Sequence, residues 1–229
     1  MCLQSTSHQL LNSQNFRLTA TGAGCTFLFT PSWVRTVQSQ GRKVTTEELE
    51  ALLEGAEESD SLEFKGAMAW DHQGLAKDFM AMANIEFGGR IVFGIEDATL
   101  ARQGMTADQI ATFDFDIMKD QIGKLADPYI QFSKEIVTDG EGRKFVVVTV
   151  APFEDGLVIC RNNGTEVRAG AIYYRSRTRR PQSAPISNST EMRDLIDIAV
   201  VRRARRNARI GYTVAVDPGY DFDAELGGL

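Results

Sequence analysis

Glu58-Ser59-Asp60-Ser61-Leu62-Glu63-Phe64-Lys65 opens the stretch of sequence that decides the fold. Within it, Leu62 and Phe64 alternate with Glu63 and Lys65, which is the period of two expected of a half-buried strand. The alternation predicts a strand over residues 61–68. Glu63 and Lys65 therefore share one face of that strand.

A helix and a second strand follow. Apolar residues at three- and four-residue spacing predict a helix over 73–87, and a nearly all-apolar run predicts a strand over 90–95, covered on both faces. Gly88-Gly89 between them fits a helix stop and a tight turn into the strand, because glycine accepts a positive φ. Asn84 fits a residue that caps or bridges backbone groups at this turn.

The flanking sequence sets the domain limits. Residues 1–46 contain no Asp or Glu, so we expect a poorly ordered extension over 1–44. Thr45-Thr46-Glu47-Glu48 fits a capping box that starts the first helix. We expect one domain over 45–200, followed by a basic helix end and a flexible acidic tail over 201–229.

The remaining elements predict the fold class. The pattern favours one or two helices over 106–126, a hairpin that joins 130–137 to 144–151, and short strands near 157–160 and 171–174. Strands and helices are interspersed without strict βαβ repetition. This arrangement predicts an α+β fold, in which helices pack on a mixed, mostly antiparallel sheet.

The last helix should begin near Asn188 or Ser189 and end in a basic run over 202–209, which could meet a partner. Its periodicity predicts an inward face that contains Met192, Leu195, Ile196, Ala199 and Val200.

Composition indicates whether the chain crosses a membrane, which redox compartment suits it and which metals it could bind. The 229-residue chain carries a net charge of −6 and has no run of about 18 apolar residues, so we expect no membrane span. Its three cysteines are far apart, which favours a reducing cytoplasm over a disulfide framework or a thiolate zinc site. Because there are only two histidines, any metal should be magnesium or manganese held by carboxylates.

Charge is unevenly distributed. Residues 159–210 hold twelve arginines and four acids, which gives +8 locally and −14 for the rest of the chain. Such asymmetry predicts a surface that faces an anion such as nucleic acid. An arginine-rich surface that pairs with the acidic part of its own fold remains the alternative.

Taken in order, these blocks resemble the Schlafen AlbA-type domain family, also labelled divergent AAA. The resemblance covers about residues 45–200. The matching blocks are Glu58-Ser59, Leu62 to Lys65, Ala81 to Gly89, Gly94 to Asp97, Ala171 to Arg177 after Gly164, and Glu191 to Ile196. No Gly-x-x-x-x-Gly-Lys-Ser/Thr phosphate loop is present, so we predict no ATP hydrolysis.

The resemblance implies two functions. Bacterial and archaeal members are described as DNA-binding or regulatory modules, whereas animal Schlafen proteins include metal-dependent endoribonucleases with a three-carboxylate site. The matching carboxylates here are Glu58, Glu63 and either Glu96 or Asp97. If the strands at 61–68 and 90–95 are neighbours, Glu58, Glu63 and Asp97 could converge on magnesium or manganese, with Lys65 close to a phosphate.

Three hypotheses follow. In the first, the domain binds DNA or RNA without catalysis, as a transcriptional regulator would: Arg175, Arg177, Arg179 and Arg180 contact phosphates, with Tyr173 or Tyr174 stacked on a base. The alternative for Tyr174 is an ordinary strand residue. In the second, the domain is a nuclease in which Glu58, Glu63 and Asp97 bind the metal and Lys65 stabilises the scissile phosphate. In the third, it is a non-catalytic interaction subunit, for example of a homo-oligomer.

Overall fold

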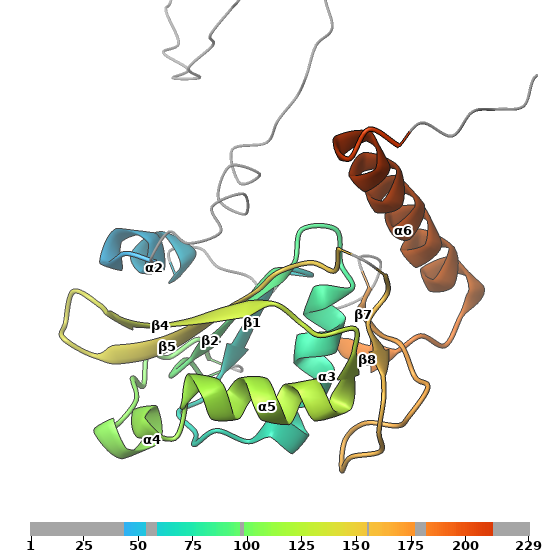
Figure 1. Cartoon of the computed structure of the whole chain (residues 1–229). Coiled ribbons are helices and arrows are strands. Elements are labelled where there is room, and N and C mark those ends of the chain that lie inside the picture. Colours follow the sequence, from blue (N-terminus) through green and yellow to red (C-terminus); the bar gives the residue numbers. More distant parts are fainter. Residues whose placement is uncertain (1–43, 54–58, 97–98, 155, 177–181, 213–229) are drawn as a thin grey trace, which may run out of the picture. The chain divides into compact units, whose positions relative to one another are not determined.

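The computed structural model describes residues 44–53, 59–96, 99–154, 156–176 and 182–212, all within one compact unit of the chain. Its centre is a four-stranded sheet in the order β1-β2-β5-β4 (Figure 1). The strands are β1 (Leu62–Lys65), β2 (Gly89–Phe93), β4 (Phe132–Thr138) and β5 (Lys144–Val150). β1 and β2 are parallel, and the other two pairs are antiparallel. The predicted α+β class with a mixed sheet is confirmed.

The described helices are α2 (Thr46–Leu53), α3 (His72–Ala83), α4 (Ala107–Ala111), α5 (Phe115–Leu125) and α6 (Ser189–Arg209). Two further strand pairs complete the fold: β3 (Ala126–Asp127) with β6 (Ile159–Cys160), and β7 (Tyr173–Arg175) with β8 (Ser183–Pro185). None of these helices is long and apolar enough to cross a membrane.

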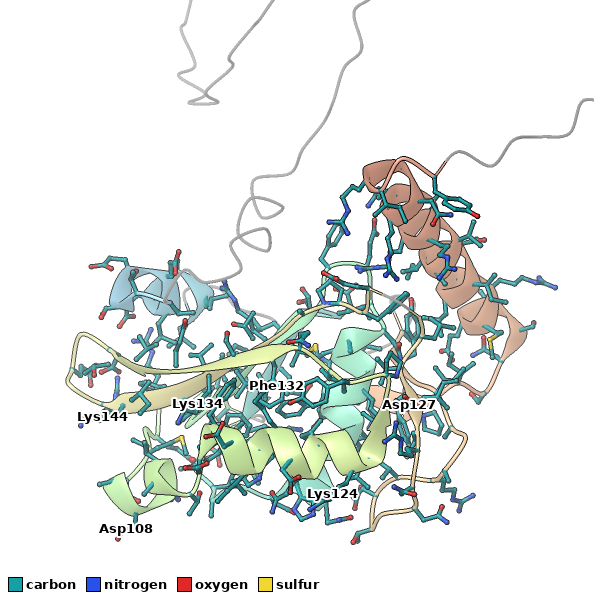
Figure 2. All side chains as sticks on the ribbon, viewed as in Figure 1. Asp108, Lys124, Asp127, Phe132, Lys134 and Lys144 are labelled. Carbon is teal, nitrogen blue, oxygen red and sulfur yellow. The ribbon has the colours of Figure 1, made fainter. Side chains whose placement is uncertain are left out.

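Both faces of the sheet are covered, as expected for the apolar strand β2. Ile91 and Phe93 pack into the larger core with α3 and α5, whereas Val92 packs into a smaller core with Leu49 of α2. Figure 2 shows Phe132 of β4 between the sheet and α5, where its ring meets the rings of Phe79 and Phe115 edge-on. The sheet is therefore the middle layer between α2 on one side and α3 with α5 on the other.

The expected cap at the start of α2 is present. The Thr45 N–H donates to Glu48 Oε2 at 3.2 Å, and the Glu48 N–H donates to Thr45 Oγ1 at 3.3 Å. These reciprocal bonds form the predicted capping box.

Asn84 ends α3 four residues earlier than the periodicity predicts, because its side chain is used outside the helix. Its amide Nδ2 donates to the carbonyls of Val158 and Tyr173, each at 2.9 Å, and its Oδ1 accepts from the Val158 N–H at 2.9 Å. Asn84 is fully buried. The prediction that it bridges backbone groups is confirmed, and these groups belong to the distant second half of the chain.

Gly88 turns the chain from α3 into β2. It has a φ of +70°, and a Cβ at this position would lie 2.2 Å from the carbonyl oxygen of Val150 on the neighbouring strand. Both the positive φ and the close backbone approach require glycine. The prediction for this turn is confirmed.

We expect Gly88→Ala to destabilise the domain far more than Gly142→Ala in chemical denaturation. Gly142 also has a positive φ, +84°, but nothing lies within 4 Å of its Cβ position, so alanine there should cost about 1 kcal/mol. Gly88→Ala adds a collision with backbone and should cost at least about 3 kcal/mol. Equal losses of unfolding free energy in the two variants would contradict the close approach.

Candidate functional site

Glu63 and Lys65 share a face of β1, as predicted, but that face points into the protein. Their neighbours Leu62 and Phe64 belong to the core beside α2, so the alternating pair points to the side of the sheet that α3 covers. Asp78 of α3 and Arg175 of β7 meet them there. We call these four residues, Glu63, Lys65, Asp78 and Arg175, the ion cluster.

Arg175 is the centre of the ion cluster, and its side chain is 0% exposed. Its Nη1 donates to Glu63 Oε2 and, at 3.3 Å, to Ser183 Oγ. Its Nη2 donates to the carbonyls of Ser59, at 2.9 Å, and Leu62, at 3.3 Å. A buried guanidinium is costly unless its charge and most of its donors are matched. These contacts supply an acidic partner and acceptors for both Nη atoms, although Nε is buried without an acceptor among the described residues.

Lys65 completes the cluster from the same strand. Its Nζ lies 2.5 Å from Glu63 Oε1 and 3.2 Å from Asp78 Oδ2. Burial alone would lower the pKa of Lys65, but the carboxylates of Asp78 and Glu63 outweigh it and raise the pKa above its usual value. For Asp78, burial is the largest effect and raises its pKa, although Lys65 opposes the rise.

The cluster balances its own charge, with two carboxylates and two cations. Both oxygens of Glu63 are taken, one by Lys65 and one by Arg175. A divalent cation at Glu63 would have to displace these contacts and leave a buried cation without its partner. The described residues therefore support a structural role for the ion cluster better than a metal-binding role for Glu63.

The other predicted metal ligands cannot be placed, since Glu58 and Asp97 lie outside the described residues. The expectation that β1 and β2 are neighbours is confirmed by their parallel pairing. Glu96, the alternative third acid, accepts a hydrogen bond from the hydroxyl of Thr99. Among the described residues, no three His, Cys, Asp or Glu side chains are grouped closely enough to hold a metal ion.

Two residues of the predicted phosphate-binding set are not at the surface. Arg175 is held in the ion cluster, and Tyr174 is only 3% exposed within the core beside α3. The strand β7 is buried because it pairs with β8 and packs against α3. The prediction of a surface role for these two is corrected, and Tyr174 is the ordinary strand residue of the alternative reading. Arg177, Arg179 and Arg180 lie outside the described residues.

A second set of arginines lies on α6. Arg202, Arg205, Arg206 and Arg209 stand at positions i, i+3, i+4 and i+7, so they form one stripe along the helix. We call these four residues the arginine stripe. No acidic residue occurs from Ile198 to Tyr212.

Arg202 fastens this stripe to the domain. Its guanidinium donates to the carbonyls of Phe153, at 2.6 Å, and Glu86, and it lies over the Phe153 ring at 4.9 Å from the centroid. Burial lowers its pKa. Further along, Arg205 and Arg209 are exposed, and neither forms an ion pair with any part of the chain that the structure describes.

The sequence did carry the signal for this stripe. The run over 202–209 was expected to be a basic helix end, but its helical spacing places four of its arginines on one face. The helix begins as predicted, with Asn188 as the N-cap that accepts from the Glu191 N–H.

The comparisons with known proteins identify the family. The sequence profile described as Schlafen, AlbA_2 matches residues 58–182, which is more than half of the chain. This chain belongs to the Schlafen AlbA_2 family. The match spans the ion cluster and Asn84 and ends before α6.

Solved structures are similar to the chain only at low identity. One is the DIP2311 protein from Corynebacterium diphtheriae, at 18% identity and a TM-score of 0.41, over 60% of this chain and 29% of that one. Another is the N-terminal domain of a RecG-related protein from Nitrosomonas europaea, at 18% identity and a TM-score of 0.38, over 65% of this chain and 97% of that one. The chain thus spans less than a third of the DIP2311 protein. No curated protein matches it significantly.

We expect Arg175→Met to destabilise the domain by about 3 to 5 kcal/mol, because it leaves Glu63 buried with Lys65 as its remaining cation. The matched control is Arg161→Met, which removes an exposed arginine from its 3.1 Å pair with Asp127 and should cost less than about 1 kcal/mol. Urea unfolding of both variants measures the difference. Similar losses in the two would mean that the ion cluster is not a structural centre.

Proposed function

We propose that this chain is a nucleic-acid-binding module that contacts phosphates through the arginine stripe of α6. The stripe itself is the observation that carries the proposal: four arginines on one face, in a stretch without acidic residues, on a protein whose net charge is −6. Phosphate contacts by arginine supply most of the sequence-independent affinity for nucleic acid. Because the protein as a whole is acidic, this local positive charge favours one specific anion-binding face and not a surface that attracts anions everywhere.

The dimensions of the stripe suit a phosphate backbone. Beyond the anchor Arg202, Arg205 and Arg209 are four residues apart, or about 6 Å along the helix axis. Phosphates of one duplex strand advance by about 3.4 Å each along the axis, so about two of them fit this length. The anchoring of Arg202 to Phe153 and Glu86 fixes the rotation of the helix, which orients the later arginines before a ligand arrives.

Arg177, Arg179 and Arg180 complete the proposed interface. They stand in the sequence between β7 and β8, and they add three positive charges to the same arginine-rich half of the chain. Arg175 and Tyr174 are left out of it because they are buried. Contacts of this kind read the backbone and not the bases, so both duplex DNA and structured RNA are suitable ligands.

The metal-dependent endoribonuclease is the second candidate, and family membership is its support. It requires Glu63 to bind magnesium or manganese with Glu58 and Asp97, while Lys65 moves to the scissile phosphate. The ion cluster disfavours this role, since Lys65 and Arg175 already neutralise Glu63. The third candidate, a homo-oligomeric interaction subunit, has no comparable charge feature in its favour.

A cleavage assay separates the first two candidates. We expect transfer RNA or single-stranded RNA to remain equally intact with the protein in manganese and in chelator, because Glu63 is not available as a metal ligand. Cleavage that requires manganese and is lost in Glu58→Ala/Glu63→Ala protein would establish the nuclease and overturn the non-catalytic assignment. Circular dichroism of the variant controls for unfolding.

The binding proposal predicts the effect of removing three stripe residues while keeping the anchor Arg202. The plot of log affinity against log salt has a negative slope. In Arg205→Gln/Arg206→Gln/Arg209→Gln protein, we expect the magnitude of this slope to decrease by about 2 for single strands and by nearly 3 for duplex DNA, because three phosphate contacts are lost. The matched control removes the same charge elsewhere, in Lys119→Gln/Lys124→Gln/Lys144→Gln protein (Lys124 and Lys144 are labelled in Figure 2). Equal effects of the two triple changes would contradict the stripe.

A further inference from the structure

The predicted inward face of α6 is only partly buried: Ala199 packs against the core as predicted, but two apolar residues of that face are exposed. Leu195 is buried, but Ile196 is 48% exposed and Val200 is 61% exposed. With Leu157 they line a shallow groove that continues along α6 to Arg203 and Asn207. Exposed apolar side chains in a row along one helix face offer a contact surface for another segment.

The chain itself leads back to the end of this groove. Gly211 has a φ of +73°, its N–H donates to the carbonyl of Ala208 at 3.2 Å, and the Tyr212 N–H donates to the carbonyl of Asn207 at 2.8 Å. These two bonds form a Schellman motif, which ends the helix and ties the next residues to its last turn. Asn207 is also the last residue of the groove, so the segment after Tyr212 starts beside it.

The sequence of that segment complements the groove. Residues 213–226 contain no Lys or Arg, and they combine apolar residues with acids. The apolar residues are Val214, Val216, Tyr220, Phe222 and Leu226, and the acids are Asp217, Asp221, Asp223 and Glu225. The groove offers an apolar floor with Arg203 in its lining, and Arg203 forms no ion pair within the described part of the chain.

We propose that residues 213–226 of this chain lie in the groove of α6 and that their acids pair with Arg203, the arginine in its lining. The segment is long enough: the groove extends over twelve helical residues, from Ile196 to Asn207, or about 16 Å, and fourteen extended residues reach about 46 Å. Bound there, its carboxylates place negative charge within about a Debye length of the arginine stripe and so weaken the attraction of the stripe for phosphates. This regulatory consequence rests on the proposed function, whereas the docking itself does not.

Photocrosslinking tests the docking without nucleic acid. The full chain carries p-benzoylphenylalanine in place of Val200, within the groove, or in place of Val201, which is exposed about 100° around the same helix. We expect Val200→p-benzoylphenylalanine protein to crosslink to residues 213–226 of its own chain, and the Val201 variant to do so far less. Mixing heavy- and light-isotope chains identifies crosslinks between copies.

Two crosslinking results would overturn the proposal. One is a product between heavy and light chains, which would make a second copy the occupant. The other is the absence of any product with 213–226 while the probe reacts elsewhere or not at all.

Neutralising the acids tests the regulation. In Asp221→Asn/Asp223→Asn/Glu225→Gln protein we expect affinity for single-stranded RNA to rise about 5-fold or more, with fewer crosslinks at Val200. The control, Asp108→Asn/Asp116→Asn/Asp120→Asn, makes the same change in net charge on α4 and α5. An equal rise in RNA affinity in the two variants would mean that only net charge matters, and it would overturn the proposed regulation. If none of the proteins binds RNA, the proposed function is wrong, but the crosslinking result still tests whether residues 213–226 lie in the groove.

Discussion

The pair between Glu63 and Arg175 is the interaction on which the arrangement of this domain depends. It joins β1, near the start of the described domain, to β7, more than a hundred residues later. A guanidinium with no exposed surface holds its place only while its acidic partner and the carbonyls of Ser59 and Leu62 remain in position. Asn84 makes a second connection between the same two regions, through Val158 and Tyr173. Both connections are polar and directional, so they specify how the second half of the chain packs on α3.

This packing decides which residues are available for function. The family's Leu-Glu-Phe-Lys block contributes Leu62 and Phe64 to one core and Glu63 and Lys65 to a charge-balanced cluster under α3. Its polar residues are therefore used within the fold. Two exposed arginines that form no ion pair within the described ranges, Arg205 and Arg209, lie instead on α6, beyond the part of the chain that the family profile matches. Family membership and the proposed binding surface thus rest on different segments.

Local patterns in the sequence predicted the strands of the main sheet and several element ends, but not the short strands β3 and β8. Period two located β1 and the shared face of Glu63 and Lys65, the capping box located α2, and Gly88 marked the turn into β2. The sequence could not say whether the Glu63 face meets solvent or protein, because that depends on Asp78 and on Arg175 at a separation of 112 residues.

The errors concern long-range packing as well. Arg175 was expected to contact phosphates and Tyr174 to stack on a base, because arginines bind phosphates and aromatic rings stack on bases, but no local pattern marks a buried arginine. On α6, periodicity predicted an inward face, but Ile196 and Val200 remain exposed because the core contacts on this helix centre on Leu195. Helical periodicity identifies an apolar face, but it does not identify the surface that this face contacts.

An amide NMR titration of the intact protein with an oligonucleotide distinguishes the arginine stripe from the ion cluster as the binding surface. If the stripe binds, the largest chemical-shift changes occur in residues 202–209 of α6, while the amides of residues 62–65 in β1 stay unchanged. Shifts centred on residues 62–65, with α6 unaffected, would contradict the proposed binding surface, because nucleic acid would then meet the ion cluster instead of the arginine stripe.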